Sequence, residues 1–123
     1  MYSISVEQHF DAAHALRGYK GKCEALHGHR FRVVARIEAS TLDDIGLAYD
    51  FVELKARLAD VISRFDHTNL NDIPPFDKIN PSSENIAANV YKELKSRLAG
   101  DKISLTAIEV WESPENMVSY SPD

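Results

Sequence analysis

A thiol and two imidazoles stand close together in the stretch Cys23-Glu24-Ala25-Leu26-His27-Gly28-His29. Side chains two positions apart on a strand point to the same face of the sheet. His27 and His29 can therefore direct two imidazoles at one point, as a bound metal requires. A catalytic zinc usually takes three protein ligands and keeps a fourth position open. The pair therefore needs one more ligand from elsewhere in the chain.

Alternation of apolar and polar residues in two neighbouring segments indicates where that ligand lies. Even positions from Tyr2 onward are mostly apolar, and this parity continues to His14. The apolar odd positions of residues 29–37 share their parity with His27 and His29. We therefore expect all three histidines on the inward side of two adjacent antiparallel strands. A first strand of this length also predicts a bulge or bend near Gln8–Asp11.

Three convergent imidazoles, with no carboxylate in the pattern, suit zinc with water or substrate in the open position. A single inward histidine such as His14 is more often a satisfied core residue, so the metal hypothesis rests on the trio. Cys23 leaves three alternatives open. It is a small hydrophobic residue, or a thiolate base or nucleophile favoured by its basic loop, or a fourth ligand that would close a structural zinc site.

Two further positions carry titratable groups. His67 follows Asp66 at a predicted helix end, where it either caps the helix or relays protons with Asp66 orienting it. Glu112 ends a predicted strand beside Trp111. It is either a solvated strand end, which is the commoner case, or a carboxylate that accepts two parallel N–H bonds from a planar heterocycle.

The charge of the chain is unevenly spread. Residues 14–32 contain five basic side chains and one acidic side chain, whereas the whole chain has a net charge of −5. The common explanation is a solvated loop and one polar strand face. The alternative is a pocket for an anion such as a phosphate chain, with Arg17, Lys20 and Lys22 as its candidate residues.

Composition bounds the class of protein. A chain of 123 residues, 44% hydrophobic and 27% charged, predicts one globular domain over residues 1–123. The acidic balance argues against a nucleic-acid partner. We see no membrane span and no leader segment, so we expect no membrane partner. A lone cysteine is typical of a reducing cytoplasm.

The remaining segments predict the elements that position these residues. Asp50 with Glu53 resembles a capping box before a helix that ends near Phe65. A long loop follows over residues 66–81. Ser82 or Ser83 can cap a second helix that Gly100 ends, and strands are expected over 103–110 and 117–120. This order predicts an α+β fold, a four-stranded antiparallel sheet with two helices on one face. Its uncovered face and edges predict an oligomer.

Taken in order along the chain, these residues resemble the 6-pyruvoyltetrahydropterin synthase / 6-carboxytetrahydropterin synthase family. The likeness rests on Phe10-Asp11-Ala12-Ala13-His14, Cys23 with His27-Gly28-His29, Asp50-Phe51-Val52-Glu53-Leu54-Lys55, Asp66-His67 with Leu70-Asn71, Asn80-Pro81 with Glu84-Asn85, and Trp111-Glu112-Ser113. It implies the tunnelling fold, in which sheets of a trimer join into a barrel. It also implies a homohexamer, a dimer of trimers, with active sites at subunit interfaces.

The resemblance also implies roles for individual residues. His14, His27 and His29 would hold Zn²⁺, Cys23 would be the base, and Asp66 with His67 would complete a proton relay. Glu112 would anchor the pterin ring of 7,8-dihydroneopterin triphosphate.

The three residues between Cys23 and His27 resemble the bacterial 6-carboxytetrahydropterin synthases of queuosine (7-deazaguanine) biosynthesis. Pyruvoyl-forming enzymes of the family typically have a longer spacer. The expected reaction is a carbon–carbon lyase reaction that yields 6-carboxy-5,6,7,8-tetrahydropterin, acetaldehyde and triphosphate. Two alternatives remain: the pyruvoyl-forming synthase, and a non-catalytic zinc- or pterin-binding oligomer on the same fold.

Overall fold

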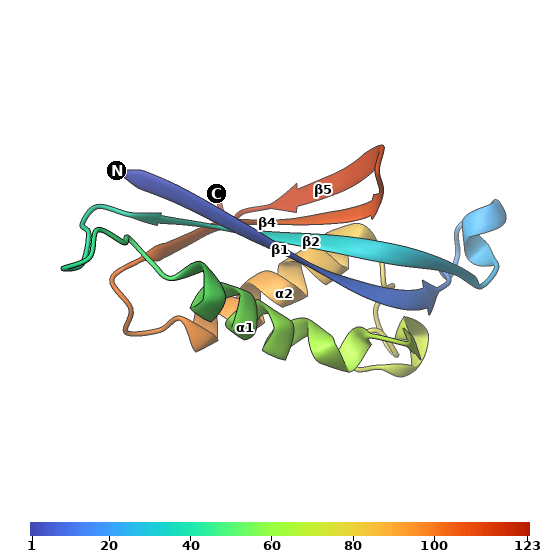
Figure 1. Cartoon of the computed structure of the whole chain (residues 1–123). Helices are drawn as coiled ribbons and strands as arrows, with labels where there is room; N and C mark the ends of the chain where they lie inside the picture. The colour runs from blue at the N-terminus through green and yellow to red at the C-terminus, as the bar shows by residue number, and fades with distance from the viewer.

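The structure is a computed structural model that describes the backbone of residues 1–123 and all side chains except that of Cys23. Two long strands come first, then two helices, then two more strands, and a short strand lies between the helices (Figure 1). The elements are β1 Tyr2–His14, β2 His27–Ala39, α1 Phe51–Ile62, β3 Thr68–Asn69, α2 Ser83–Arg97, β4 Ser104–Ser113 and β5 Asn116–Tyr120.

The strands form one sheet in the order β3-β1-β2-β4-β5. The four long strands pair antiparallel, which confirms the predicted sheet. The predicted number of strands was wrong, because the two-residue β3 adds a fifth strand. It pairs parallel with β1 through Ala12↔Thr68 and Ala13↔Asn69. So short a strand has no apolar periodicity of its own, and a sequence pattern cannot reveal it.

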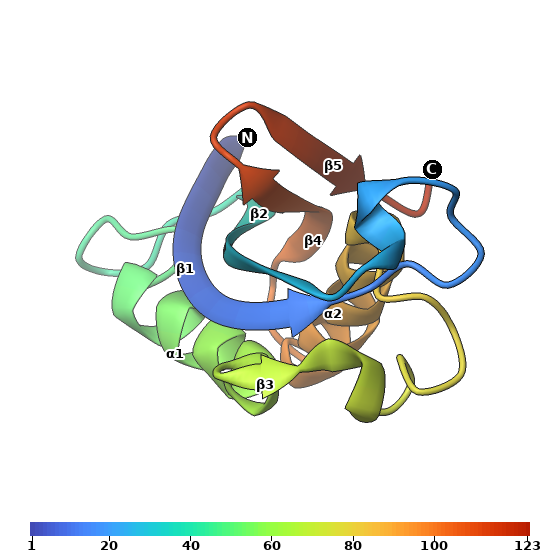
Figure 2. The ribbon, with the colours of Figure 1, turned by 90° about the vertical axis from the view of Figure 1, so that its right-hand side faces the viewer.

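β1 and β2 pair without interruption from Tyr2↔Ala39 to His14↔His27. Of the predicted bulge or bend, the bulge near Gln8–Asp11 is therefore absent from this pair, and β1 bends instead, as one smooth arc (Figure 2). An unbroken register preserves the alternation of faces along both strands. This is why the parity that buries Phe10 and Phe31 also carries the histidines at the strand ends to the inner face.

Both helices lie on one face of the sheet (Figure 1), as predicted. Asp50 caps α1, where its side chain accepts a hydrogen bond from the backbone N–H of Val52. The second hydrogen bond of the predicted capping box, from the backbone N–H of Asp50 to the side chain of Glu53, was predicted wrongly. Glu53 instead accepts a hydrogen bond from Arg57, one turn further along the helix, at 2.7 Å. This pairing at i and i+4 is an equally local alternative for the carboxylate.

The side chain of Ser82 caps α2 and accepts from the backbone N–H of Asn85. The apolar faces of both helices pack on the inner face of the sheet, with Leu54, Ile86 and Leu94 fully buried. Among the described residues, no helix combines the length and the apolar character needed to cross a membrane. The apolar core does not reach this end of the sheet. The inward positions there, His14 at the end of β1 and His27 and His29 at the start of β2, are polar.

Candidate metal centre

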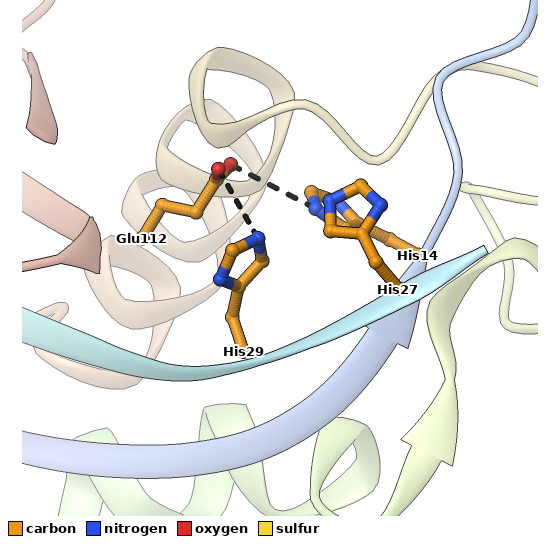
Figure 3. A group of neighbouring side chains, drawn as sticks. All are labelled: His14, His27, His29 and Glu112. Carbon is orange, nitrogen blue, oxygen red and sulfur yellow. Dashed lines mark ion pairs between the residues drawn. The ribbon is translucent and has the colours of Figure 1, made fainter. Parts of the chain in front are cut away.

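Four side chains converge where β1 and β4 end and β2 begins (Figure 3). His14, His27, His29 and Glu112 each offer one ligand atom, and these atoms all lie within 4.8 Å of one another. His14 stands directly opposite His27 in the sheet, and His29 stands opposite Ala12. The convergence of the three imidazoles that strand parity predicted is therefore confirmed.

Backbone carbonyls orient two of the three rings. The Nδ1 atom of His14 lies 2.7 Å from the carbonyl oxygen of Pro81, and that of His27 lies 2.8 Å from the carbonyl oxygen of Ala25. A carbonyl only accepts hydrogen bonds, so each Nδ1 must be the protonated nitrogen and donate. In the neutral rings Nε2 then keeps its lone pair. This arrangement is usual for histidines that bind a metal through Nε2.

The centre holds polar atoms that nothing in the described part of the chain satisfies. The Nε2 atoms of His14 and His29 are buried and have no hydrogen-bond partner there. His14 is only 1% exposed, and this burial lowers its pKa, which favours the neutral imidazole that a metal needs. Buried polar atoms without partners are rare in folded proteins. The donor set therefore fits a metal ion.

Glu112 brings a carboxylate to this group. Its Oε1 atom lies 3.2 Å from Nε2 of His29, and its Oε2 atom lies 3.7 Å from Nε2 of His14. The first contact is close, but its geometry is not that of a hydrogen bond to His29. Ser83, in the first turn of α2, donates to Oε2 at 3.5 Å. The simple solvated strand end is thus wrong, and the expectation of a centre without a carboxylate was incomplete.

Asp66 and His67 belong to a second group of side chains at the edge of β1. The carboxylate of Asp66 accepts a hydrogen bond from the backbone N–H of Asp11 at 2.9 Å, and its other oxygen lies 3.0 Å from Nδ1 of His67. The hydrogen bond from Asp11 is the main cause that lowers the pKa of Asp66, and His67 lowers it further. Asp66 is therefore anionic at neutral pH and can orient the imidazole.

His67 itself is held by its backbone. Its N–H donates to the carbonyl of Asp11 at 2.6 Å, and its φ of 58° lies in the left-handed region that is uncommon for residues other than glycine. Its imidazole is 78% exposed. The role of helix cap is wrong, because α1 ends at Ile62 and His67 bonds to β1 instead. Within the described residues this pair is a separate group from the three histidines.

The remaining predicted residues lie in or next to the loop between β1 and β2. The side chain of Cys23 lies outside the described residues. Lys20 and Lys22 are exposed, so both ammonium groups are accessible to an anion. The guanidinium of Arg17 donates to the carbonyl oxygens of Phe76, Ile79 and Asn71 at 2.7, 3.3 and 3.4 Å. These contacts support a role in holding a loop, while phosphate binding by Arg17 stays a prediction.

A small cavity of about 150 Å³ adjoins Glu112. It is lined by Glu112, by the first turn of α2 at Ser83, and by β5 at Met117. Sites that enclose a small molecule usually measure about 300–1,000 Å³. One chain therefore provides only part of the space that a bicyclic ligand would occupy.

Comparison with known proteins agrees with this geometry. The sequence profile described as 6-pyruvoyl tetrahydropterin synthase matches residues 3–123. The chain belongs to this family. It is 35% identical over 125 residues to a 6-carboxy-5,6,7,8-tetrahydropterin synthase from Synechocystis sp., with 98% of this chain and 93% of the relative covered. It is also 36% identical over 106 residues to a dihydroneopterin monophosphate aldolase from Pyrococcus furiosus, with 86% and 85% covered.

Solved structures show the same fold. The 6-pyruvoyl tetrahydropterin synthase of Caenorhabditis elegans superposes with a TM-score of 0.86 at 26% identity, covering 99% of this chain and 96% of that chain. Family relatives are named as tetrahydropterin synthases, so the chain is a member of a family of pterin synthases, which are lyases.

Sequence reasoning missed two residues that shape the site. Pro81 orients His14 through its carbonyl, and Asp11 holds both Asp66 and His67 through its backbone. Each acts through a main-chain atom, which any residue type possesses. The signal in the sequence was therefore the place of these residues within the motifs shared with the family, and not their side-chain chemistry.

Proposed function

We propose that the protein is a zinc-dependent 6-carboxy-5,6,7,8-tetrahydropterin synthase. It would convert 7,8-dihydroneopterin triphosphate and one water molecule to 6-carboxytetrahydropterin, acetaldehyde and triphosphate in queuosine biosynthesis. The observation that carries the proposal is the convergence of three imidazoles, two of which are fixed so that Nε2 is free for a metal. It is joined by the three-residue spacer between Cys23 and His27. The relative from Synechocystis supports the carboxy-forming branch.

His14, His27 and His29 would hold the zinc ion. When bound, such an ion supplies Lewis-acid chemistry, lowering the pKa of coordinated hydroxyls and polarising a carbonyl. The arrangement of the rings suits this task, because three ligands from two rigid strands leave room for substrate oxygens.

Cys23, as the thiolate, would remove a proton from the substrate side chain. His67, oriented by Asp66, would return a proton elsewhere. Asp66 and His67 form a group apart from the histidines of the same chain. We therefore propose that a neighbouring subunit brings the two groups together, in a homo-oligomer (a hexamer built from two trimers) that acts in the cytoplasm.

Glu112 would accept hydrogen bonds from the pterin ring at the small cavity next to it. The size of this cavity is a second reason to place the complete substrate pocket between subunits. Lys20 and Lys22, which are exposed beside the metal-binding strand, would contact the triphosphate.

Product identification by mass spectrometry tests the proposal. The zinc-loaded protein is incubated with 7,8-dihydroneopterin triphosphate, beside a chelated control. Carboxytetrahydropterin and acetaldehyde that disappear on chelation are the expected products. Cys23→Ala should keep zinc and pterin binding and lose about 10²–10⁴-fold in turnover. Loss of zinc from that variant would identify the thiol as a ligand and would overturn the assignment of Cys23 as the base.

Two other products have support from relatives. A pyruvoyl product would match the name of the structurally similar nematode enzyme. Cleavage of a monophosphate substrate would match the aldolase relative from Pyrococcus furiosus, and an arm of the assay with 7,8-dihydroneopterin monophosphate detects it. Pterin and zinc binding without turnover of either substrate would indicate a binding protein.

A further inference from the structure

We infer that Asn71, Asn80 and Arg17 are positioning residues for His14, which hold residues 71–81 against the chain that leaves β1. The inference rests on the proposed metal centre. It begins from the hydrogen bond between Nδ1 of His14 and the carbonyl oxygen of Pro81, two residues that lie 67 positions apart. Nothing local in the sequence keeps them at 2.7 Å, so the fold must hold the two segments together.

Two asparagine side chains make that connection. Asn71 accepts from the backbone N–H of Ala15 at 2.9 Å and donates to its carbonyl at 3.0 Å. Asn80 does the same with Arg17, accepting from its N–H and donating to its carbonyl, both at 2.9 Å. Each amide therefore pairs with both main-chain groups of one residue, as a neighbouring strand would.

The positions of these pairs are informative. Ala15 directly follows His14, and Asn80 directly precedes Pro81. One asparagine pair therefore fixes the backbone next to His14, and the other fixes the backbone next to Pro81. A side-chain amide from Asn85, in the first turn of α2, donates to the carbonyl of Asn80 at 2.8 Å and ties this junction to the helix.

Arg17 binds the backbone of the segment that connects the two asparagines. Its guanidinium donates to the carbonyls of Asn71, Phe76 and Ile79, and the ring of Phe76 is fully buried. A planar guanidinium with several fixed donors suits a set of converging carbonyls better than an ammonium does. Arg17 thereby fixes the curvature of the segment that ends at Pro81.

The consequence for the metal centre is direct. The bond to Pro81 fixes the tautomer and the rotation of the His14 ring, and so the direction of the Nε2 lone pair. Loss of such a partner typically weakens metal binding about 10–100-fold. Residues that merely stabilise the fold would lower stability without changing the affinity for metal.

Asn80→Ala tests the inference, with Asn89→Ala as its matched control. Asn89 lies on α2 and accepts a hydrogen bond from Arg64 at 3.0 Å. The control therefore removes one side-chain amide hydrogen bond, against two in Asn80→Ala, and leaves Pro81 untouched. The affinity for Co²⁺ and the visible spectrum of the cobalt protein are measured, together with the melting temperature of the metal-free protein. We expect about tenfold weaker binding and an altered spectrum for Asn80→Ala, and less than a twofold change in affinity for Asn89→Ala.

The tautomer of His14 provides a readout that needs no metal. In the metal-free protein at pH 8, two-bond ¹H–¹⁵N correlation spectra should show the Nδ1–H form of His14 in the wild type and in Asn89→Ala. They should show a mixture of tautomers in Asn80→Ala. Should Asn80→Ala fail to fold, Asn80→Asp replaces it. This variant keeps an acceptor for the N–H of Arg17 and replaces the amide donor with a charged oxygen that cannot bond to the carbonyl of Arg17. Arg17→Lys provides the same test at the guanidinium.

Equal losses of melting temperature in Asn80→Ala and Asn89→Ala, with cobalt affinity and tautomer unchanged, would overturn the inference. Failure of the proposed metal centre has a different signature. In that case the wild type binds neither Co²⁺ nor Zn²⁺, whereas the shift of the His14 tautomer in Asn80→Ala still shows that the asparagine positions the ring.

Discussion

Buried polar groups on the two faces of the sheet differ in whether they have hydrogen-bond partners. On the inner face, Nε2 of His14 and Nε2 of His29 have no hydrogen-bond partner in the described part of the chain. On the outer face, Glu109 is nearly as buried, at 9% exposed, yet both of its oxygens are paired. Arg36 donates to one at 2.7 Å and the indole of Trp111 donates to the other at 3.0 Å.

The outer network extends further. The guanidinium of Arg32 lies 4.3 Å from the centre of the Trp111 ring and 3.6 Å from the carboxylate of Glu7. Buried polar groups with a purely structural role normally have hydrogen-bond partners, as Glu109 does here. The unfinished contacts of the inner face therefore distinguish a ligand site from a structural network, although both consist of charged and aromatic side chains on the same strands.

Removal of one imidazole should weaken metal binding at the inner face while the protein still folds. His29→Ala should weaken zinc binding about hundredfold, since the 10–16 kcal/mol typical of zinc sites is roughly 3 kcal/mol for each of four ligands. Chelator competition measures this loss. Urea unfolding of the metal-free variant should show only a small loss of stability, about 1 kcal/mol from the edge-on packing of the ring against His27 and Phe31, because Nε2 had no hydrogen-bond partner in the described part of the chain. A metal-free variant that is less stable than the wild type by several kcal/mol would contradict the comparison.

Substitution of Glu112 tests whether this carboxylate on the inner face binds the pterin or the metal. Glu112→Gln should reduce pterin affinity by about 2 kcal/mol, roughly 30-fold, because charge-assisted hydrogen bonds to the ring are lost. Zinc affinity should change only a few-fold if the carboxylate anchors substrate. Fluorescence titration with a pterin and chelator competition measure the two quantities. A zinc loss as large as that of His29→Ala would make Glu112 a metal ligand instead.

The outer network should respond in stability alone. Glu109→Gln should lower the free energy of unfolding by about 1–2 kcal/mol at pH 7, because the half-exposed Arg36 loses its charged partner. Urea denaturation measures this change, and zinc affinity is the control. Any substantial loss of zinc from Glu109→Gln would show that the two faces are coupled and would remove the contrast between them.

The same carboxylate predicts a dependence on pH. Burial raises the pKa of Glu109, but hydrogen bonds from Arg36 and Trp111 outweigh it and hold the pKa below the ordinary 4.5. The unfolded chain therefore takes up this proton first as the pH falls, and stability is lost. The difference in stability between wild type and Glu109→Gln should be constant down to about pH 4.5 and shrink below it. A difference that grows in acid would reverse the direction of the pKa shift.

Local patterns predicted most of the frame. Alternation placed β1 and β2 and the face on which His14, His27 and His29 lie, and helical spacing with Ser82 as cap placed α2. The two errors have different causes. Glu53 had two local partners available and took Arg57, a competition that spacing alone does not decide. β3 exists because the segment at Asp66 and His67 bonds to Asp11 on β1, a pairing that is not visible in one segment considered alone.

The sequence by itself determined which residues share the inner face, because the alternation of side chains along a strand is a local property of the backbone. It also determined the order of the two helices and the four long strands, and the family. Only the tertiary structure decided what those side chains meet. The carboxylate of Glu112 beside His29, the carbonyl of Pro81 on His14, and the nitrogens left without partners all depend on segments that are distant in the chain. Contacts of that kind follow from packing and not from periodicity.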